Sequence, residues 1–193
     1  MIQKEEQRPV HLVRATPDDA GQLTVVQGRA FLGDRKWMPK DILSSVLAMD
    51  DPQPGPPGCT SVEWNRRAIE NERVTYYKIL LGARIVGGLI LFDNGGSEWE
   101  LGRIYIEPDY QNRAIGQRVL RKMYQLHSDV KRWRLGTPEW ATRNQHFYQK
   151  MGFTIVEVTA VDPNLGWRSV EYEKTFPCEC VENALNLKVN LRY

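Results

Sequence analysis

The chain has 193 residues, of which 41% are hydrophobic and 26% charged, and its formal net charge is +2. This size and composition indicate one globular domain with a substantial core, and the small net charge argues against nucleic acid or an anionic membrane as a partner. No apolar run approaches the roughly 20 residues that span a bilayer, and the polar first residues lack a signal-peptide core, so we expect a cytoplasmic protein.

The first predicted elements are a short strand and two helices. Residues 10–14 have the composition of a strand, and Thr16 followed by proline is an N-terminal helix signature. The first helix is expected to run to about Phe31 and to break at residues 33–34. A second, short helix follows at about 40–49.

The most loop-like stretch lies at residues 51–58, which are dense in proline and glycine. Such a stretch is also typical of a linker between domains. Helical composition returns over residues 61–72, and each flank is too short to fold alone. We therefore interpret this stretch as an internal loop.

Three antiparallel strands are predicted next. The runs 74–81 and 84–92 read as a hairpin joined at 82–83, and the glycine-rich turn 93–96 leads into a third strand from about Ser97. Because a helix follows these strands and crosses over to later ones, the pattern indicates a mixed sheet.

Residues 100–124 combine a strand, a tight turn and a helix. The strand ends before Pro108, which has no N–H for a sheet ladder, and apolar residues recur at helical spacing from Ala114. The turn 111–116 and the helix start leave several backbone N–H groups unpaired and pointing one way, an arrangement that binds anions such as phosphate. On its own, such a turn is a weak signal that many α/β proteins share.

The wider pattern of this stretch is Glu-Leu-x-x-Ile-Tyr-Ile-x-Pro-x-Tyr-Gln-x-x-x-Ile-Gly. It resembles the acetyl-CoA-binding motif of the GCN5-related N-acetyltransferases (GNATs), Gln/Arg-x-x-Gly-x-Gly/Ala. Ala114 replaces the first motif glycine, and its methyl group narrows the freedom of the backbone but keeps the amide donors. The resemblance implies these cofactor-binding residues: Ile104, Tyr105, Ile106, Gln111, Asn112, Arg113, Ala114, Ile115, Gly116, Gln117 and Asn144.

The second half of the chain predicts a strand, a helix and two further strands. The strand at 130–137 carries a basic cluster that we interpret as a solvated sheet edge. A helix capped by Thr142 is closed by Gly152, and the last strands are expected at 153–161 and 167–176.

The end of the chain holds two of the three cysteines, which are Cys59, Cys178 and Cys180. An odd number is not a disulfide framework, and no Cys or His cluster completes a zinc site, so we expect no metal. Four alternating apolar residues over 185–191 are compatible with either a last strand or a dimer contact.

A second segment, residues 144–153, resembles the GNAT signature Phe/Leu-Tyr-x-x-x-Gly-Phe. Tyr148 matches the tyrosine that protonates the leaving thiolate in that family. The family's frequent asparagine lies seven residues earlier, where this chain has Ala141, so Asn144 is an approximate substitute. The alternative is a packed Tyr148 with its hydroxyl bonded to the backbone.

An amine must lose a proton before or as it attacks a thioester, and Glu100 is our candidate base. Certain aminoglycoside acetyltransferases carry a carboxylate at the matching place. In a strand without a bulge, the Glu100 side chain is expected on the same sheet face as Gly102, Ile104 and Ile106. The alternatives are that Glu100 is a surface carboxylate, or that Glu107, Glu139 or a water chain is the base.

The resemblance covers residues 10–176 and implies an α/β (α+β) fold. This fold is a mixed, mostly antiparallel sheet of about seven strands flanked by helices, with a splayed strand pair that holds acyl-CoA. We expect one domain at 1–176, with 33–72 as a variable helical and loop insertion on the acceptor side, and a C-terminal extension at 177–193.

The implied function is N-acetyl transfer from acetyl-CoA to a primary amine, and a small-molecule amine is favoured because the insertion can wall off a compact pocket. Trp37 and Trp64 are candidate substrate-lining residues, with plain packing as the alternative. A protein or peptide acceptor and a non-catalytic acyl-CoA-binding module remain open, and the resemblance favours a homodimer.

Overall fold

The computed structural model describes residues 9–48, 55–163 and 165–177. They form a seven-stranded sheet with the order β1-β2-β3-β4-β5-β7-β6, in which every neighbouring pair is antiparallel except the parallel pair β4–β5. The predicted mixed, mostly antiparallel sheet is confirmed. The strands are β1 (Val10–Arg14), β2 (Val74–Leu81), β3 (Arg84–Asp93), β4 (Glu98–Ile106), β5 (Arg132–Pro138), β6 (Thr154–Val158) and β7 (Ser169–Thr175).

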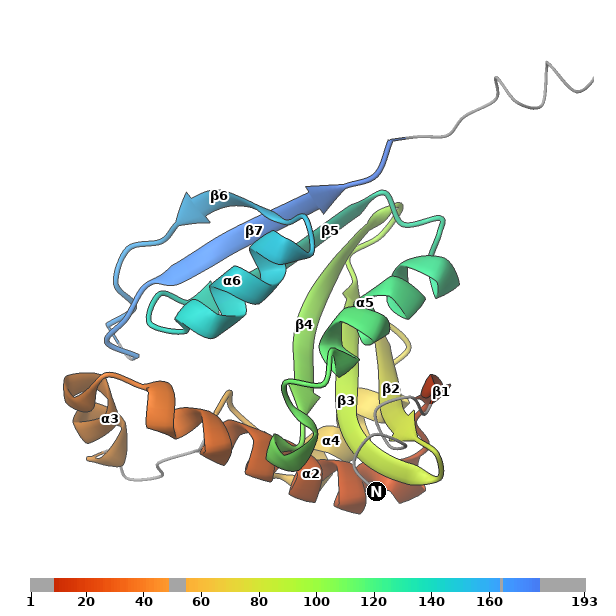
Figure 1. Ribbon diagram of the computed structural model, residues 1–193, viewed down its shortest axis with the longest axis horizontal. Coiled ribbons are helices and arrows are strands. Elements are labelled where there is room, and N and C mark those ends of the chain that lie inside the picture. The colour runs from red at the N-terminus through yellow and green to blue at the C-terminus, as the bar shows by residue number, and fades with distance from the viewer. Residues whose placement is uncertain (1–8, 49–54, 164, 178–193) are drawn as a thin grey trace, which may run out of the picture.

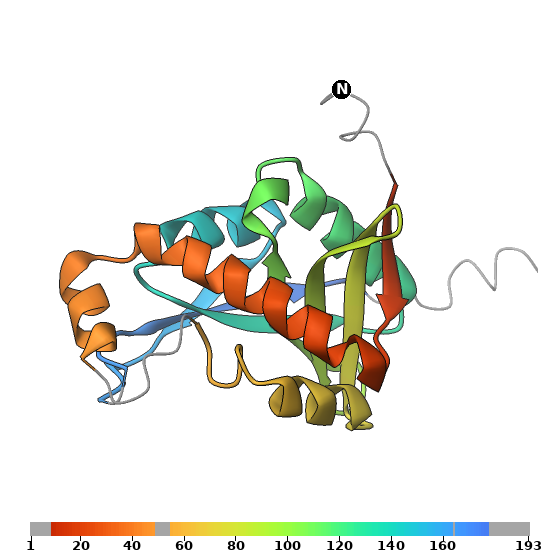
Figure 2. The same cartoon turned by 90° about the horizontal axis from the view of Figure 1, so that it is seen from below.

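Five α-helices flank the sheet within the described ranges: α2 (Ala20–Asp34), α3 (Lys40–Leu47), α4 (Val62–Glu70), α5 (Ile115–Leu126) and α6 (Thr142–Lys150). Short 3-10 turns precede and follow some of them: η1 (Pro17–Asp19), η2 (Arg35–Trp37) and η3 (Pro108–Tyr110). Figures 1 and 2 show α5 and α6 on one face of the sheet and α2 and α4 on the other. None of the described helices is both long and apolar enough to cross a membrane.

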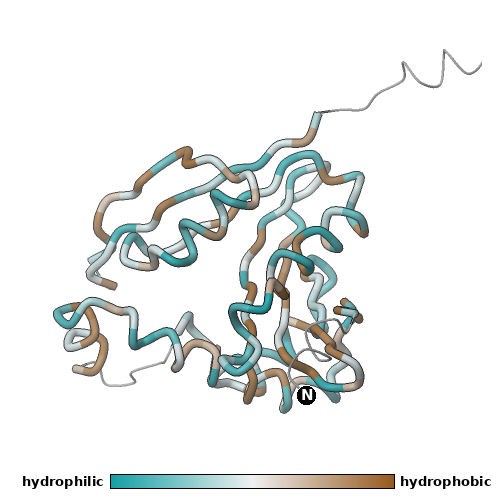
Figure 3. The backbone as a smooth tube through the Cα atoms, in the orientation of Figure 1, coloured by the Kyte–Doolittle hydropathy of each residue, from teal (hydrophilic) through white to brown (hydrophobic). Residues whose placement is uncertain are grey.

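Two hydrophobic cores lie on the two faces of the sheet. Leu120 and Trp133 are fully buried in the first core, between the sheet and helices α5 and α6. Leu23 and Tyr76 belong to the second core, against α2 and α4. Strand β3 supplies both cores, which explains why it is apolar on both faces on either side of Gly87 and Gly88; Figure 3 shows brown stretches along it.

Helix α2 continues to Asp34, so the predicted break at residues 33–34 is wrong. A β-carbon added at Gly33 would lie 2.9 Å from the Cγ atom of Pro108. The glycine therefore serves the close approach of α2 to η3 and does not end the helix. Thr142 is likewise the first residue of α6, and the N-cap position falls on Ala141.

The sheet divides between its two central strands. Strands β4 and β5 pair only where residues 98–100 meet residues 132–134, although each keeps its antiparallel partner on the other side. Figure 1 shows β4 and β5 diverging, with α5 over one half of the sheet and α6 over the other. This is the splayed strand pair that the sequence predicted.

Strand β4 contains a β-bulge. Leu101 lies opposite Leu91, and Arg103 lies opposite the next residue of β3, Ile90, so that Gly102 is the extra residue. A bulge of this kind reverses the alternation of side chains along the strand that carries it.

The bulge corrects the expected orientation of Glu100. Glu100 pairs with Phe92, which packs against the second core, whereas Ile104 and Ile106 pack against the first. Its side chain therefore lies on the α2 and α4 side of the sheet and not on the face of Ile104.

The buried carboxylate of Glu107 links α2 to the sheet. It accepts hydrogen bonds from Arg29 at 2.9 Å and from Arg84 at 3.2 Å. We expect Glu107→Ala to lower the free energy of unfolding by about 1–3 kcal/mol, measured by chemical denaturation, because two charge-assisted bonds are lost. In Glu63→Ala, which breaks an exposed pair with Arg67, the change should stay within about 0.5 kcal/mol. Equal losses in the two variants would contradict a stabilising role of the buried carboxylate.

Candidate active site

The loop between β4 and α5 has a constrained backbone. The side-chain amide of Gln111 donates a hydrogen bond to the carbonyl oxygen of Ile106 at 3.0 Å and so closes the turn after β4. Asn112 and Ala114 adopt positive φ angles of 60° and 54°. Helix α5 begins directly after Ala114, and the N–H groups of its first turn have no intrahelical partner.

The first turn of α5 packs closely on α6. A β-carbon at Gly116 would lie 3.2 Å from the ring of Phe147, so a glycine at this position lets the two helices approach. Ile115 is buried in the first core, which leaves only its backbone for a ligand. Gln117 is half-buried, and the guanidinium of Arg113 lies 5.3 Å from the ring centre of Tyr110.

The edge of β4 that faces the split has free main-chain groups. Beyond Glu100, the strand pairs with β3 on one side and not with β5 on the other. The Tyr105 side chain is buried in the second core, and its hydroxyl lies 2.6 Å from that of Tyr76. The Tyr105 hydroxyl therefore points away from the split, and residues 104–106 present only main-chain groups along this edge.

A cavity of about 620 Å³ lies beside this split. Strands β4 and β5 contribute Gly102 and Gly136 to its lining, and three tryptophans form apolar walls. The charged lining residues are Asp34, Arg35, Glu100, Arg143 and Glu171, and the tryptophans are Trp37, Trp140 and Trp167.

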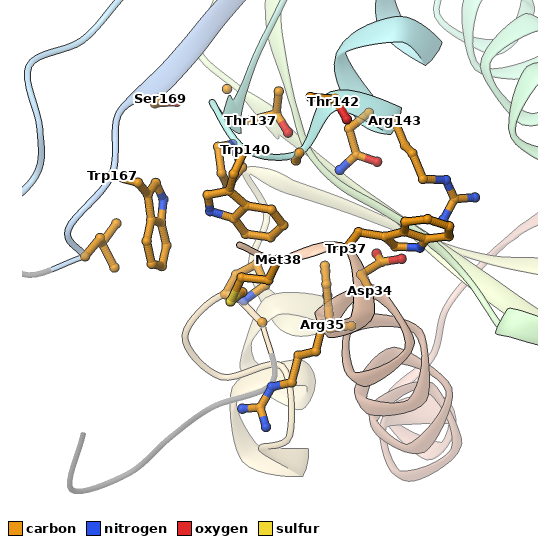
Figure 4. Close-up of a pocket in the computed structure, with 18 of the residues that line it drawn as sticks. Asp34, Arg35, Trp37, Met38, Thr137, Trp140, Thr142, Arg143, Trp167 and Ser169 are labelled. Atoms are coloured by element: carbon orange, nitrogen blue, oxygen red, sulfur yellow. The ribbon is translucent and has the colours of Figure 1, made fainter. Parts of the chain in front are cut away.

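The tryptophans form two groups in the cavity. Trp140 and Trp167 meet edge to face, with ring centres 6.1 Å apart and planes at 87°. Arg143 reaches from α6 over the ring of Trp37 at 4.9 Å, beside Asp34 (Figure 4). The cavity thus has flat aromatic walls, and the charged groups of Arg143 and Asp34 lie beside Trp37.

Two acidic groups in the cavity have raised pKa values. Burial raises the pKa of Glu100 above 4.5, and the like charge of Glu171 raises it further. Burial also raises the pKa of Asp34, while the charges of Arg143 and Lys36 act in the opposite direction. Both groups take up a proton more readily than an exposed carboxylate.

Tyr148 lies outside the cavity lining, in the first core, with its ring 6.1 Å from that of Tyr172. Burial raises the pKa of its hydroxyl well above 10, and Asp34 and Tyr172 raise it further. Among the described residues, none forms a hydrogen bond with this hydroxyl. The alternative, in which the Tyr148 hydroxyl is bonded to the backbone, is therefore not observed within the described residues.

The structure brings only some of the predicted site residues together. Trp37, Glu100 and Asn144 line the cavity, whereas Trp64 lies elsewhere, under the guanidinium of Arg103 at 4.0 Å. Asn112 accepts a bond from Arg143 at 3.4 Å and so connects the loop to α6.

The sequence interpretation missed Asp34, Arg143, Trp140, Trp167 and Glu171 as lining residues. A signal existed for the last of them, because the alternation of β7 places Glu171 on the opposite face from the buried residues. For the others, the cavity depends on contacts between distant segments that no local pattern reports.

Ala114 adopts a left-handed conformation that is costly for any residue with a β-carbon. We expect Ala114→Gly to raise the free energy of unfolding by about 1 kcal/mol, since relief of this strain exceeds the added freedom of the unfolded chain. Thermal denaturation measures the effect. Ala30→Gly, inside α2, is the control and should lower the free energy of unfolding by about 1 kcal/mol. If both variants lower the free energy of unfolding, the backbone at residue 114 is unstrained.

Comparison with known proteins matches the central part of the chain to a family. A family model described as an acetyltransferase (GNAT) domain matches residues 72–155, from just before β2 to the start of β6. No curated protein sequence matches the chain.

Solved structures share the fold. The PaiA N-acetyltransferase from Thermoplasma acidophilum, in complex with coenzyme A, is 18% identical with a TM-score of 0.67, covering 87% of this chain and 99% of its own. The ribosomal-protein-S18-alanine N-acetyltransferase from Escherichia coli is 13% identical with a TM-score of 0.65, covering 90% and 99%. The microcin C7 self-immunity acetyltransferase MccE, in complex with acetyl-CoA and AMP, is 14% identical with a TM-score of 0.63, covering 90% and 95%.

At these identities the solved structures establish the fold, and the family model matches the central segment that contains strand β4 and the turn before α5. The GNAT resemblance of residues 100–124 is thereby confirmed. Residues 72–155 thus match an acetyltransferase (GNAT) domain, and the described chain has the fold of solved acetyltransferases.

Proposed function

We propose that the protein transfers an acetyl group from acetyl-CoA to a primary amine of a small molecule by direct attack in a ternary complex. The observation that carries the proposal is the course of β4. This strand lines the cavity at Glu100 and Gly102, continues along the split, and ends at the loop before α5. One strand thus connects a cavity for an acceptor with a turn suited to phosphate.

The residues along this course fit acetyl-CoA. The free edge of β4 at residues 104–106 can pair with the amides of a pantetheine arm as an added strand does. The N–H groups of residues 112–117, at the start of the twelve-residue helix α5, suit a pyrophosphate, and Arg113 adds positive charge nearby. When bound, acetyl-CoA supplies the thioester whose acyl group is transferred.

We assign the proton transfers to two residues. Glu100, with its raised pKa, accepts a proton from the acceptor ammonium group and so produces the neutral amine. Tyr148, whose hydroxyl stays protonated at neutral pH, donates a proton to the leaving thiolate. N–H groups of β4 on the side of the split stabilise the oxyanion that forms at the thioester carbonyl.

A small acceptor is favoured by the walls of the cavity, which come from α2, the loop at 55–57, and the segments around α6 and β7. A volume of about 620 Å³ is the size of a small-molecule site. A protein acceptor, as the name of the Escherichia coli relative indicates for that enzyme, needs an open groove for a chain.

Calorimetric titration with acetyl-CoA, followed by thiol release with a panel of amines and a short peptide, tests the proposal. Binding with amine-dependent release of CoA is expected. Binding without release for any acceptor would favour a non-catalytic acyl-CoA-binding module, and release with the peptide alone would favour a protein acceptor. Absence of binding would reject the assignment of the β4 edge and the α5 turn.

The cytoplasmic location and the homodimer remain predictions from the sequence and the family resemblance. Sedimentation velocity over a range of protein concentrations tests the second: a single species with the mass of one 22.3 kDa chain would contradict it.

A further inference from the structure

Four charged residues of β4, β5 and β7 form ion pairs with one another on the sheet face opposite the first core. Arg132 and Arg134 each contact Glu98 at 3.3 Å, and they contact Glu173 at 3.8 Å and 3.2 Å respectively. Two carboxylates and two guanidinium groups thus form a neutral network where β4 and β5 still pair.

Two further carboxylates on this face lie outside the network. Glu100 is two residues beyond Glu98 on β4, and Glu171 is two residues before Glu173 on β7. Neither forms an ion pair or hydrogen bond through its side chain with any residue that the structure describes. They influence each other, because the charge of Glu171 raises the pKa of Glu100.

The position of Glu171 depends on the absence of a side chain on β5. Gly136 is its direct partner across the antiparallel pair. A β-carbon at Gly136 would lie 2.7 Å from Oε1 of Glu171 and 2.9 Å from Oε2, so the carboxylate occupies the space of the missing side chain. Both residues line the cavity. The cavity is therefore bordered by two carboxylates that repel each other and form no ion pair with any described residue, since Arg134, the register partner of Glu100 on β5, pairs with Glu98 and Glu173.

The other charged residues of the cavity interact with groups other than Glu100 and Glu171. The charges of Arg143 and Lys36 act on Asp34, and Arg143 stacks on Trp37. The Arg35 side chain extends away from Trp140 and Trp167 (Figure 4). The wall of the cavity that remains for an acceptor to contact is therefore the aromatic surface of Trp140 and Trp167, and not a positive side chain.

We infer that the acceptor is an arylalkylamine without a carboxylate: its ammonium group binds between Glu100 and Glu171, and its aromatic body lies against Trp140 and Trp167. This inference rests on the proposed function and names its substrate class. A single ammonium group neutralises part of the repulsion between the carboxylates, whereas an acceptor carboxylate adjacent to the amine would increase it. The tryptophans offer the edge and face contacts that an aromatic ring prefers.

The two glutamates then have different tasks. Glu100 accepts one proton from R–NH₃⁺, and Glu171 accepts a hydrogen bond from the amine and so holds it in place. The N–C bond forms and the C–S bond breaks, Tyr148 protonates the leaving thiolate, and the second proton from nitrogen passes through solvent to restore the Tyr148 hydroxyl. The products are a neutral amide, CoA thiol and the proton on Glu100, which passes to solvent. The amide has no charge for the glutamates to hold, which favours its release.

The acceptor panel contains 2-phenylethylamine, phenylalanine and ethylamine, with acetyl-CoA as the donor. They share a primary amine, and they differ in one carboxylate or in the aromatic body. We expect the highest kcat/KM for 2-phenylethylamine, a value lower by about a hundredfold for phenylalanine, and one lower by about tenfold or more for ethylamine.

Variants separate the two contacts. Glu171→Gln should raise the KM for 2-phenylethylamine about tenfold or more, since a charge-assisted bond is lost. Glu173→Gln, on the same strand and face but inside the neutral network, is the matched control and should leave that KM within about twofold. Trp167→Ala should raise the KM for 2-phenylethylamine and not that for ethylamine.

Gly136→Ala supplies an independent test, because it displaces the Glu171 carboxylate without removing it and should also raise KM. The Kd of acetyl-CoA, measured for each variant, confirms an intact fold. A better rate with phenylalanine, or equal effects of Glu171→Gln and Glu173→Gln, overturns the inference while amine-dependent CoA release preserves the proposed function. Acetyl-CoA binding without release for any amine overturns both.

Discussion

Tyr148→Phe is expected to lower kcat by about a hundredfold or more, the usual effect of losing a general acid, while the Kd of acetyl-CoA changes little. The hydroxyl is buried and its pKa is raised well above 10, so it keeps its proton as the pH rises through the neutral range. It can therefore protonate a leaving thiolate at any physiological pH. Thiol release under saturating acceptor measures the loss.

Tyr124→Phe is the matched control for this variant. Tyr124 also carries a buried phenol with a raised pKa in contact with the first core, and none of the described residues pairs with its hydroxyl. Its loss should leave kcat within about twofold. If both phenylalanine variants lose activity equally, the effect comes from core packing, and Tyr148 has no special role in proton transfer.

Glu100→Gln is expected to lower kcat/KM by about a hundredfold or more and to remove the acid limb of the pH–rate profile. The carboxylate acts as a base only when ionised. Burial and Glu171 raise its pKa, so in the parent protein activity should rise with pH through a value above 4.5 and reach a plateau once Glu100 is ionised. Glu171→Gln removes the like charge and should move this limb to lower pH.

The other charges that line the cavity, Asp34, Arg35 and Arg143, are unchanged in both variants, so the shift of the limb reports on the pair of glutamates. Glu98→Gln is the control, because Glu98 belongs to the neutral network with the arginines. In Glu98→Gln, the acid limb of the pH–rate profile should stay at the pH of the parent protein. A Glu100→Gln protein that keeps its activity and its acid limb would assign the base to another residue or to water.

The parts of the fold that the sequence predicted correctly are those specified within short segments. Pro108 and Gly116 mark the end of β4 and the first turn of α5, and both lie next to the residues whose conformation they set. The alternation and turn chemistry of residues 74–106 likewise specify neighbouring strands, because their hydrogen-bond partners are close along the chain.

The errors arise where distant segments decide the structure. The bulge at Gly102 is a property of the pairing between two strands, and nothing in β4 alone reports which residue is extra. Gly33 is a helix breaker by propensity, but here its lack of a side chain admits Pro108. Trp140 and Trp167 are separate in sequence and meet only because β5 and β7 are partners.

The split between β4 and β5 also ties the folding of the chain to its ligand. A molecule that pairs with the open edge of β4 completes a sheet that exists only in the native state, so it binds the native chain and not the denatured one. At one hundred times its Kd such a molecule adds about 2.7 kcal/mol to native stability, against roughly 5–15 kcal/mol for a whole domain. When that molecule is scarce, more of the protein is transiently open to proteases. Its lifetime in a cell would then follow the supply of its own acyl donor.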